Sequence, residues 1–267
     1  MAKVDRTGEK RFNNLGSEMI IINSYTEFNS KYNRNYAYID VYFPRYNWTF
    51  KYANYSNFKK GEIKCPYERN VYGVGYMGEG KYNTRENGRQ TRVYNSWYNM
   101  FRRCYDEKFH EKQPRYIGCE VGKEFHNFQN FGCWDKENYY KVEGERMHLD
   151  KDILVKHNKI YSPETCVFVP QTINSLFVKN DKNRGESVIG TSPLENGKYQ
   201  VHCRIINPET GKSKQEYLGT YDTQERAFEV YKYYKEKNIK EVANYYKDKM
   251  PNELYQALYF YEVEITD

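Results

Sequence analysis

The chain has 267 residues, a net charge of +6 at neutral pH and an isoelectric point of about 8.7. This length suffices for two or three small domains, but at a mean hydropathy of −1.03 and 39% hydrophobic residues each core must be small. No apolar run approaches the roughly 18 residues of a membrane helix, and the charged start is unlike a signal peptide. We therefore expect a soluble cytoplasmic protein without a membrane partner. Its mildly basic surface suits nucleic acid but also fits an ordinary soluble protein.

Tyrosine and cysteine are the two informative residue types. Tyrosine occurs 30 times and can stack on bases or bond phosphates, although AT-rich coding DNA also enriches tyrosine together with Asn and Lys. The six cysteines include no C-x-x-C pair, whereas a structural zinc site normally shows closely spaced ligands. We expect buried thiols and no zinc. The alternative is that four cysteines converge in space: Cys104, Cys119, Cys133 and Cys166.

The first 80 residues predict a small β domain. Short strands are expected at residues 19–22, 36–43 and 48–52, with turns rich in Asn, Gly and Lys between them, as in a small barrel or curled sheet. The sequence leaves open whether this domain positions DNA or only packs. Residues 73–80 are glycine-rich but lack the Gly-Lys-Ser/Thr ending of a phosphate loop, so we expect a flexible joint there.

Two helices are expected next. At residues 94–105 apolar side chains, Trp97 among them, recur at helical spacing. Beside this stripe, Arg102 and Arg103 are candidates for contact with DNA phosphates. A second helix is expected at residues 122–134, where three phenylalanines would be buried.

The pattern then changes to strand, loop, strand and short helix. Residues 147–154 alternate as a half-buried strand does, and Asn158 opens a polar turn. Residues 166–169 form a short apolar strand, and residues 172–177 predict one or two helical turns. A polar residue stands at each corner of this arrangement, which is typical of a metal site.

This stretch resembles the HNH nuclease family, and more narrowly its phage and bacterial homing-endonuclease branch. That branch carries W-x-x-M-x-x-R-C-Y, then L-D-[RK], then N-x-x-Y-x-P-x-x-C, then N, an order found here over residues 94–177. The matching residues are Trp97, Met100, Arg103, Cys104, Tyr105, Leu149, Asp150, Lys151, Asn158, Tyr161, Pro163, Cys166 and Asn174. The resemblance implies a ββα-metal fold that holds one divalent ion between its first strand and its helix.

The resemblance also implies a cofactor. Asp150 and Asn174 stand where the family keeps its metal ligands, and Asp152 is a further candidate. We therefore expect Mg²⁺ or another divalent cation at this site, because it would stabilise the charge that develops on a cleaved phosphodiester. Asn158 stands at the family's middle Asn, which braces the loop.

Lys151 departs from the pattern. It stands where active family members carry the histidine that deprotonates the attacking water. Lysine is a poor base at neutral pH, because its unperturbed pKa is about 10.4. Either the pKa of Lys151 is lowered, or a nearby histidine, His148 or His157, takes over, or the site no longer cuts.

The C-terminal part carries a second resemblance. Residues 179–186 are entirely polar and predict a linker. Beyond it, residues 187–235 resemble the plant ethylene-response-factor (APETALA-type) DNA-binding domain, a three-stranded sheet backed by one helix. The specific part is Leu-Gly-Thr-Tyr-Asp-Thr at residues 218–223, followed by a helix for which Thr223 is the expected N-cap.

The strand at residues 199–205 predicts two different faces. Its residues alternate, so one set should pack on the helix through Ala227, Phe228 and Tyr231: Tyr199, Val201, Cys203 and Ile205. The resemblance implies that the other set, with two residues of the next strand, enters the major groove of double-stranded DNA: Gln200, His202, Arg204, Gln215 and Tyr217. Gln and Arg can make bidentate base contacts there, whereas a merely solvated sheet face would also be polar. Ser187 and Thr191 stand where that family's first strand usually carries arginines.

These expectations describe a multidomain α+β chain. The expected parts are a small β domain at residues 1–80, an HNH-like module at 81–180, an ethylene-response-factor-like domain at 181–238 and a helical extension at 239–267. The last part should contain one or two packing helices and a terminal acidic strand.

Three functions remain open at this point. We expect first a phage-type endonuclease that cleaves double-stranded DNA at a recognised site in the cytoplasm of a host bacterium. The second is a catalytically inactive DNA-binding regulator, which Lys151 favours. The third is a phage factor that binds a host protein, against which the basic balance and the polar sheet face argue mildly.

Overall fold

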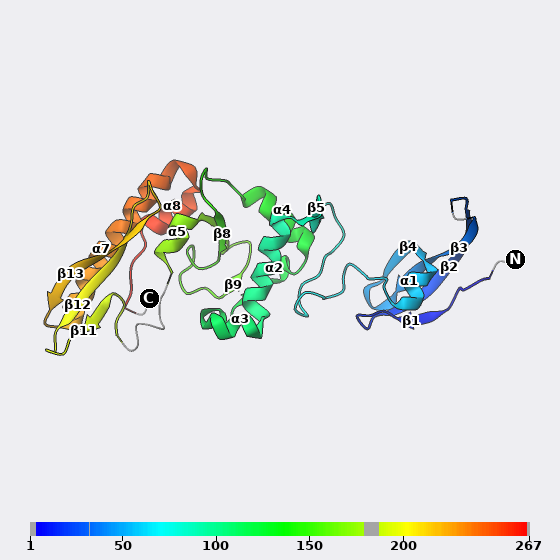
Figure 1. Ribbon diagram of the computed structural model, residues 1–267, viewed down its shortest axis with the longest axis horizontal. Helices are drawn as coiled ribbons and strands as arrows, with labels where there is room; N and C mark the ends of the chain where they lie inside the picture. Colours follow the sequence, from blue (N-terminus) through cyan, green and yellow to red (C-terminus); the bar gives the residue numbers. More distant parts are fainter. Residues whose placement is uncertain (1–3, 32, 179–186, 266–267) are drawn as a thin grey trace. The chain divides into compact units, whose positions relative to one another are not determined.

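The computed structural model describes residues 4–31, 33–178 and 187–265. Contacts divide the chain into two compact units, Met1–Cys133 and Trp134–Asp267. Each unit combines sheets with helices (Figure 1), which confirms the expected α+β class. The linker expected at residues 179–186 lies outside the described residues. In the described ranges, no helix is both long and apolar enough to cross a membrane.

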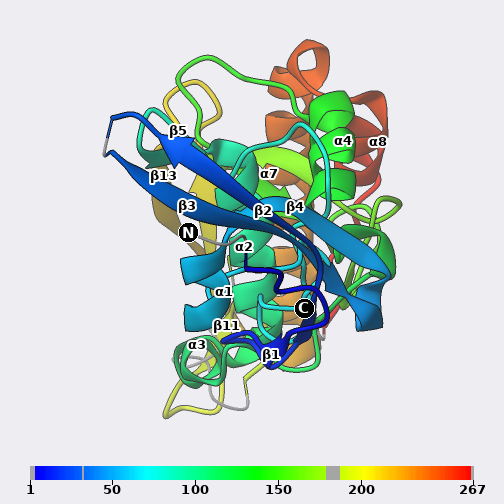
Figure 2. The ribbon, with the colours of Figure 1, turned by 90° about the vertical axis from the view of Figure 1, so that its right-hand side faces the viewer.

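The first unit begins with an antiparallel sheet whose strands are neighbours in chain order. Its elements are β1 (Lys10–Phe12), β2 (Glu18–Asn29), β3 (Arg34–Phe43), η1 (Pro44–Tyr46), β4 (Trp48–Asn54) and α1 (Tyr55–Lys60). β2 and β3 form a long hairpin (Figure 2) in which Ile21 lies opposite Val41. Among the described strands, β1 pairs only with β2 and β4 only with β3, so the sheet is open and the barrel alternative is wrong.

The core of this sheet comes from alternate residues, because successive side chains of a strand point to opposite faces. Met19 and Ile21 of β2 are buried against Phe43 and Phe58. Ile22 lies at a register shift between β2 and β3 and is 40% exposed. The buried strand expected at residues 19–22 therefore buries only part of its length.

The rest of the first unit is mainly helical. Its elements are β5 (Arg85–Glu86), β6 (Arg89–Gln90), α2 (Arg92–Tyr105), α3 (Glu107–Lys112), η2 (Pro114–Tyr116), β7 (Glu120–Val121) and η3 (Lys123–Phe125). The next helix, α4 (Phe128–Asn138), begins in the first unit and ends in the second. The hydroxyl of Thr91 caps α2 by accepting the Tyr94 N–H at 3.2 Å. The Trp97 indole N–H donates to the Phe125 carbonyl at 2.7 Å. The helix expected at residues 94–105 is thus confirmed, while the one expected at 122–134 begins only after a 3-10 turn.

Gly75 shows that the glycine-rich stretch at residues 73–80 is packed. A Cβ at this position would lie 2.9 Å from the ring of Phe101 and 3.1 Å from that of Trp97. The neighbouring Tyr76 N–H donates to the His126 carbonyl at 2.9 Å. The expected flexible joint is therefore wrong for this part of the stretch, where glycine permits a close approach to α2.

The second unit contains short paired strands, a three-stranded sheet and a long helix. Its elements are β8 (Met147–Asp150), β9 (Ile160–Tyr161), β10 (Val167–Pro170), α5 (Gln171–Leu176), β11 (Thr191–Pro193), β12 (Tyr199–Ile206), β13 (Ser213–Tyr221), α7 (Gln224–Tyr246), η4 (Lys247–Lys249) and α8 (Asn252–Tyr259). β8 pairs antiparallel with β10, and β11, β12 and β13 form an antiparallel sheet in that order.

One hydrophobic core runs through the second unit. It takes Val169 from β10, Ile173 from α5, Val201 from β12 and Val242 from α7. α7 covers one face of the β11–β12–β13 sheet (Figure 1) and also contacts α5. The parts expected as an HNH-like module and a separate C-terminal domain therefore share buried side chains. The four-part division of the chain stays a prediction.

Helix α7 is longer than expected. The hydroxyl of Thr223 accepts the Arg226 N–H at 3.2 Å, which confirms the expected N-cap. The helix then continues for 23 residues, across the boundary expected after residue 238. Asn238 is buried there, and its amide donates to the Ile206 carbonyl and accepts the Ile206 N–H, each at 2.9 Å. The prediction of a terminal acidic strand is wrong, since the described residues 261–265 form no strand.

Candidate functional site

The ββα frame, defined as β8, β10, α5 and the loop at residues 151–166, contains most of the site residues expected from the HNH resemblance. His148 lies opposite Val169 and Asp150 opposite Val167, so both polar residues point to the same face of the hairpin. Helix α5, which carries Asn174, packs against both strands. This agrees with the expected order of strand, loop, strand and short helix.

Asp150 anchors the start of the loop. One of its carboxylate oxygens, Oδ1, accepts the backbone N–H groups of Asp152 at 2.9 Å and of Ile153 at 2.8 Å. Burial raises the pKa of Asp150 to about 6, and the nearby carboxylate of Asp152 adds to the rise. A metal ion at this position would therefore find one oxygen of Asp150 already engaged by the loop.

Lys151 has its ammonium inside the loop. The residue is only 5% exposed, and its Nζ donates to Oδ2 of Asp152 and to the carbonyl of Asn158, both at 2.9 Å. The ring of Tyr161 lies 5.8 Å from Nζ and adds a cation–π contact. An ammonium that donates to these acceptors has no lone pair with which to take a proton from water. In this geometry Lys151 contributes hydrogen bonds to the loop, and a catalytic role for it stays a prediction.

The side chain of Asn158 in turn binds the backbone of Lys151. Its Nδ2 donates to the carbonyls of Lys151 at 2.7 Å and Ile160 at 2.6 Å, and its Oδ1 accepts the Ile160 N–H at 3.1 Å. All of these bonds stay within the loop, which agrees with the bracing position that the resemblance implied. A catalytic part for Asn158 remains a prediction.

The candidate metal ligands have partly engaged oxygens. Oδ2 of Asp152 accepts the Lys151 ammonium, and Oδ1 of Asp150 accepts two backbone N–H groups of the loop. Mg²⁺ can bind through one or two protein oxygens and keep several waters, and a site for it at Asp150, Asn174 and Asp152 stays a prediction. Over the part of the chain that the structure describes, no three His, Cys, Asp or Glu side chains gather as a metal site. Five of the six cysteines are buried and Cys133 is exposed.

The second candidate region is the outer face of the C-terminal sheet, defined as Gln200, His202, Arg204, Gln215 and Tyr217. His202 lies opposite Tyr217 and Arg204 opposite Gln215 across β12 and β13, while Gln200 lies opposite Thr220. The rings of His202 and Tyr217 are 5.4 Å apart, and Tyr217 is 60% exposed. The structure therefore brings together all five residues expected at a DNA groove.

The opposite face of the same strand is apolar, as the alternation predicts. Val201 and Cys203 are fully buried against α7, where Ala227 and Tyr231 belong to the same core. Ile205 is only partly buried, and Ile206 is the buried residue at the end of the strand. A register shift between β12 and β13 lies near Val201, but the sheet keeps one apolar and one polar face.

Other DNA-binding candidates are less favourably placed. In the first unit, Arg102 forms an ion pair with Asp106 at 3.6 Å, and the guanidinium of Arg103 lies 5.7 Å from the ring of Tyr116. In the first strand of the C-terminal sheet, Thr191 is buried and donates its hydroxyl to the Val188 carbonyl at 2.9 Å. β11 therefore presents no arginine where the ethylene-response-factor family usually does.

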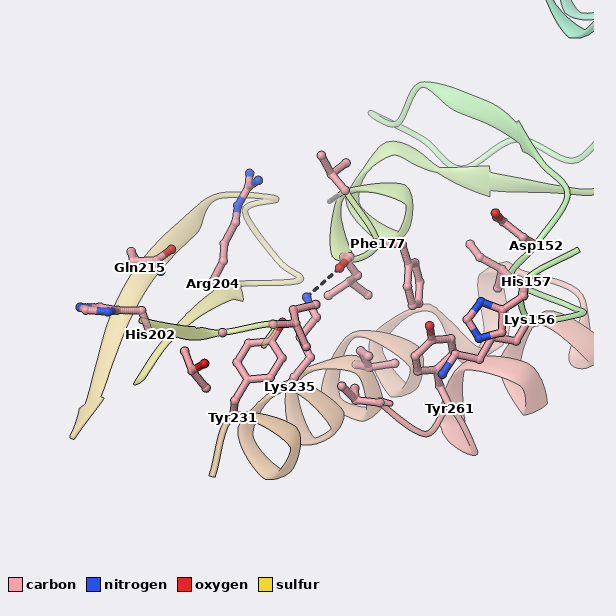
Figure 3. A pocket seen from close by; sticks show the side chains of 18 of the residues that line it. Asp152, Lys156, His157, Phe177, His202, Arg204, Gln215, Tyr231, Lys235 and Tyr261 are labelled. Carbon is pink, nitrogen blue, oxygen red and sulfur yellow. Dashed lines mark hydrogen bonds between the residues drawn. The ribbon is translucent and has the colours of Figure 1, made fainter. Parts of the chain in front are cut away.

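A cavity at the edge of this sheet was not expected from the sequence. It has a volume of about 420 Å³ and is lined by residues of α5, β12 and α7 and by the C-terminal segment (Figure 3). Lys235 reaches into it from α7. The signal was present in the sequence, because Tyr231, Lys235 and Ile239 recur every fourth residue and so place a lysine within an apolar helix stripe.

Comparisons with known protein families, with curated proteins and with solved structures find nothing that matches this chain. The two resemblances therefore rest on the residues named above.

Proposed function

We propose that this chain binds double-stranded DNA through the outer face of β12 and β13, and that its ββα frame supports the fold without cutting the DNA. The observation that carries the first part is the cross-strand arrangement of the outer face, in which Arg204 lies beside Gln215 and His202 beside Tyr217. The B-DNA major groove is about 12 Å wide and admits such a strand pair.

Arg204 has the geometry of a base-reading residue. Its Nε donates to the Ser213 hydroxyl at 2.8 Å, which fixes the direction of the guanidinium. Its terminal nitrogens have no hydrogen-bond or ion-pair partner among the described residues. A guanidinium held in this way can donate two hydrogen bonds to O6 and N7 of a guanine. Gln215 and Gln200 on the same face can pair similarly with adenine.

The proposal that the ββα frame does not cut rests on Lys151. Its ammonium is bonded to Asp152 and Asn158 and is almost inaccessible to solvent. General-base catalysis requires an unprotonated group within reach of a water molecule. A protonated and nearly buried Lys151 would meet neither condition, and its hydrogen bonds to Asp152 and Asn158 stabilise the loop between β8 and β10.

A second candidate function is a metal-dependent DNA endonuclease. It is favoured by one observation: His148 and Asp150 share a face of β8, next to the helix that carries Asn174. In this alternative Asp150 and Asn174 would hold a divalent ion, which supplies stabilisation of the charge on the cleaved phosphate, and His148 would take the proton from water. A third possibility, binding to a host protein, has no contact in its favour.

Supercoiled plasmid and labelled duplex DNA test the proposal together. We expect the protein to bind duplex DNA, more weakly at higher salt, and to leave the plasmid intact with Mg²⁺, Mn²⁺ or EDTA. Nicking that requires a metal and disappears in Asp150→Ala would contradict the non-cutting frame and support the endonuclease. Nicking by the Lys151→His variant, with no nicking by the unchanged protein, would agree with the proposal. It would show that the ββα frame of the unchanged protein lacks only a general base. If no DNA is bound even at low salt, the protein partner becomes the remaining candidate.

A further inference from the structure

The cavity beside the outer face is large enough for a small molecule. Its volume of about 420 Å³ lies within the range of roughly 300–1,000 Å³ that is typical of small-molecule sites. Apolar side chains form much of its wall, among them Phe177, Ile189 and Ile239. The ring of Phe177 packs on that of Tyr261 with centroids 4.9 Å apart, so one wall is a pair of aromatic rings.

Gly190 shapes the opposite wall. Its φ of +76° and its position against the ring of Tyr231 both require glycine, because a Cβ would lie 2.0 Å from that ring. The carbonyl of Gly190 accepts the His202 N–H at 3.0 Å, which ties this wall to β12. The packing of Gly190 on Tyr231 and its hydrogen bond to β12 therefore define this wall of the cavity.

The two ends of the cavity differ in charge: at one end acidic and basic side chains are paired, and at the other the charged side chains are basic. At one end lie Asp152, Lys156 and His157 (Figure 3). Lys156 and His157 share the carboxylate of Glu264, at 3.1 Å and 3.3 Å, and the carboxylate of Asp152 is bonded to Lys151. These acids and bases largely neutralise one another.

At the other end the charged residues of the lining, among the described residues, are the two cations Lys235 and Arg204. Lys235 and Arg204 have no carboxylate within ion-pair distance in the described part of the chain.

A bound anion would stabilise the ammonium of Lys235. One N–H of its ammonium donates to the Leu176 carbonyl at 2.6 Å, which leaves two further N–H groups at a partly buried position (Figure 3). Burial lowers the pKa of Lys235, and Arg204 lowers it further against the opposing effect of Cys203. A negative group between this ammonium and the apolar wall would satisfy the remaining donors and offset the repulsion from Arg204.

We propose that the cavity between α5, β12 and α7 binds a small organic anion, whose charged group contacts Lys235 and whose ring or other apolar body lies against Phe177. Carboxylate, sulfonate and phosphate groups all provide the required acceptors. The site is additional to the DNA-binding function, because Lys235 and Phe177 are not part of the outer face. His202, Arg204 and Gln215 line both regions, so a bound anion would lie next to the DNA contact surface.

The test uses 1-anilinonaphthalene-8-sulfonate, which combines an aromatic body with one negative charge, and its uncharged analogue N-phenyl-1-naphthylamine. We expect one molecule of the sulfonate per folded chain, measured by fluorescence titration and calorimetry. Lys235→Met should weaken the binding of the sulfonate at least tenfold, because a charge-assisted hydrogen bond is lost, and should leave the uncharged analogue unaffected. Lys237→Met, an exposed lysine on the same helix, serves as the matched control.

Three results would overturn the proposal: no binding of the sulfonate by the full-length protein, equal weakening by Lys237→Met, or unchanged binding by a folded Lys235→Met. If Lys235→Met does not fold, Phe177→Ala decides, since it should weaken both probes together. Duplex DNA binding is measured on the same proteins. Tyr217→Ala should lower DNA affinity and keep the sulfonate site, so failure of the DNA-binding proposal is seen separately from failure of the anion site.

Discussion

The side chains of Lys151 and Asn158 each bind the other residue's backbone carbonyl. The Lys151 ammonium donates to the Asn158 carbonyl at 2.9 Å, and the Asn158 amide donates to the Lys151 carbonyl at 2.7 Å. This reciprocal pair closes the loop between β8 and β10. Two of the positions that carry the HNH resemblance therefore hold the loop together, and a lysine at this place has a structural contribution to make.

The first prediction concerns this pair. Asn158→Ala removes two donated hydrogen bonds and leaves the carbonyls of Lys151 and Ile160 without those donors. We expect the free energy of unfolding to fall by about 1–3 kcal/mol, because partly buried groups lose their partners. Urea denaturation measures the change, with Asn252→Ala, at an exposed position of α8, as the control. An unchanged midpoint for Asn158→Ala would mean that the pair does not stabilise the loop.

The second prediction concerns the cysteines. Burial raises the pKa of Cys65 and of Cys203 to about 11, so both thiols stay protonated at neutral pH. Cys133 is exposed, and we expect it alone to react rapidly with a disulfide reagent in the native protein. Cys133→Ser should remove the fast phase. We also expect no stoichiometric zinc, and about one zinc per chain in metal analysis would contradict this and make a cysteine cluster the leading explanation.

The sequence predicted those features that depend on residues close together in the chain, and missed those that depend on contacts between distant segments. The alternation around Val201 follows the two-residue repeat of a strand, and the apolar stripe around Trp97 follows the repeat of a helix. Both residues lie on buried faces, as predicted. Asn238 shows the limit. The expected boundary fell after this residue, but its amide pairs with Ile206, 32 residues earlier in the chain, and the helix continues past it with a buried face.

The candidate site shows the same limit. The resemblance assigned Asp150, Lys151 and Asn158 to one site. In the structure Asp150 ends β8, while Lys151 and Asn158 lie in the loop that follows it. It could not predict that the Lys151 ammonium points inward, because that depends on where the Asn158 carbonyl lies after folding. Lys235 was overlooked for a similar reason, since its cavity is formed by segments far apart in the sequence.

The third prediction concerns pH. The pKa of Lys235 is lowered in the fold by burial, so the unfolded chain binds this proton more tightly than the folded chain does. Lys235 therefore reduces stability at neutral pH, and the penalty fades as pH rises toward the unfolded pKa of about 10.4. We expect the stability of Lys235→Met relative to the unchanged protein to be greater at pH 7 than at pH 10. Unfolding curves at both values test this, and an equal difference would show that Lys235 is not penalised by burial.

The last prediction separates base reading from simple attraction to phosphates, through two residues on opposite faces of β12. Arg204→Ala removes the guanidinium that Ser213 orients, and should cost about 1–3 kcal/mol on a specific duplex, roughly ten- to a hundredfold in affinity. The loss should be smaller on random DNA.

Val201→Ala is the matched change on the buried face of the same strand. It should lower the free energy of unfolding by about 1–3 kcal/mol, because it opens a gap against α7, and should leave base preference as it was. Fluorescence anisotropy with a selected site and a scrambled site, at two salt concentrations, measures both variants. A face that only binds phosphates would behave differently. Arg204→Ala would then weaken both duplexes equally and reduce the salt dependence by about one unit. The two side chains lie on opposite faces of one strand. Only a base-reading surface therefore predicts that Arg204→Ala lowers DNA affinity in a sequence-dependent way while Val201→Ala leaves the sequence preference unchanged.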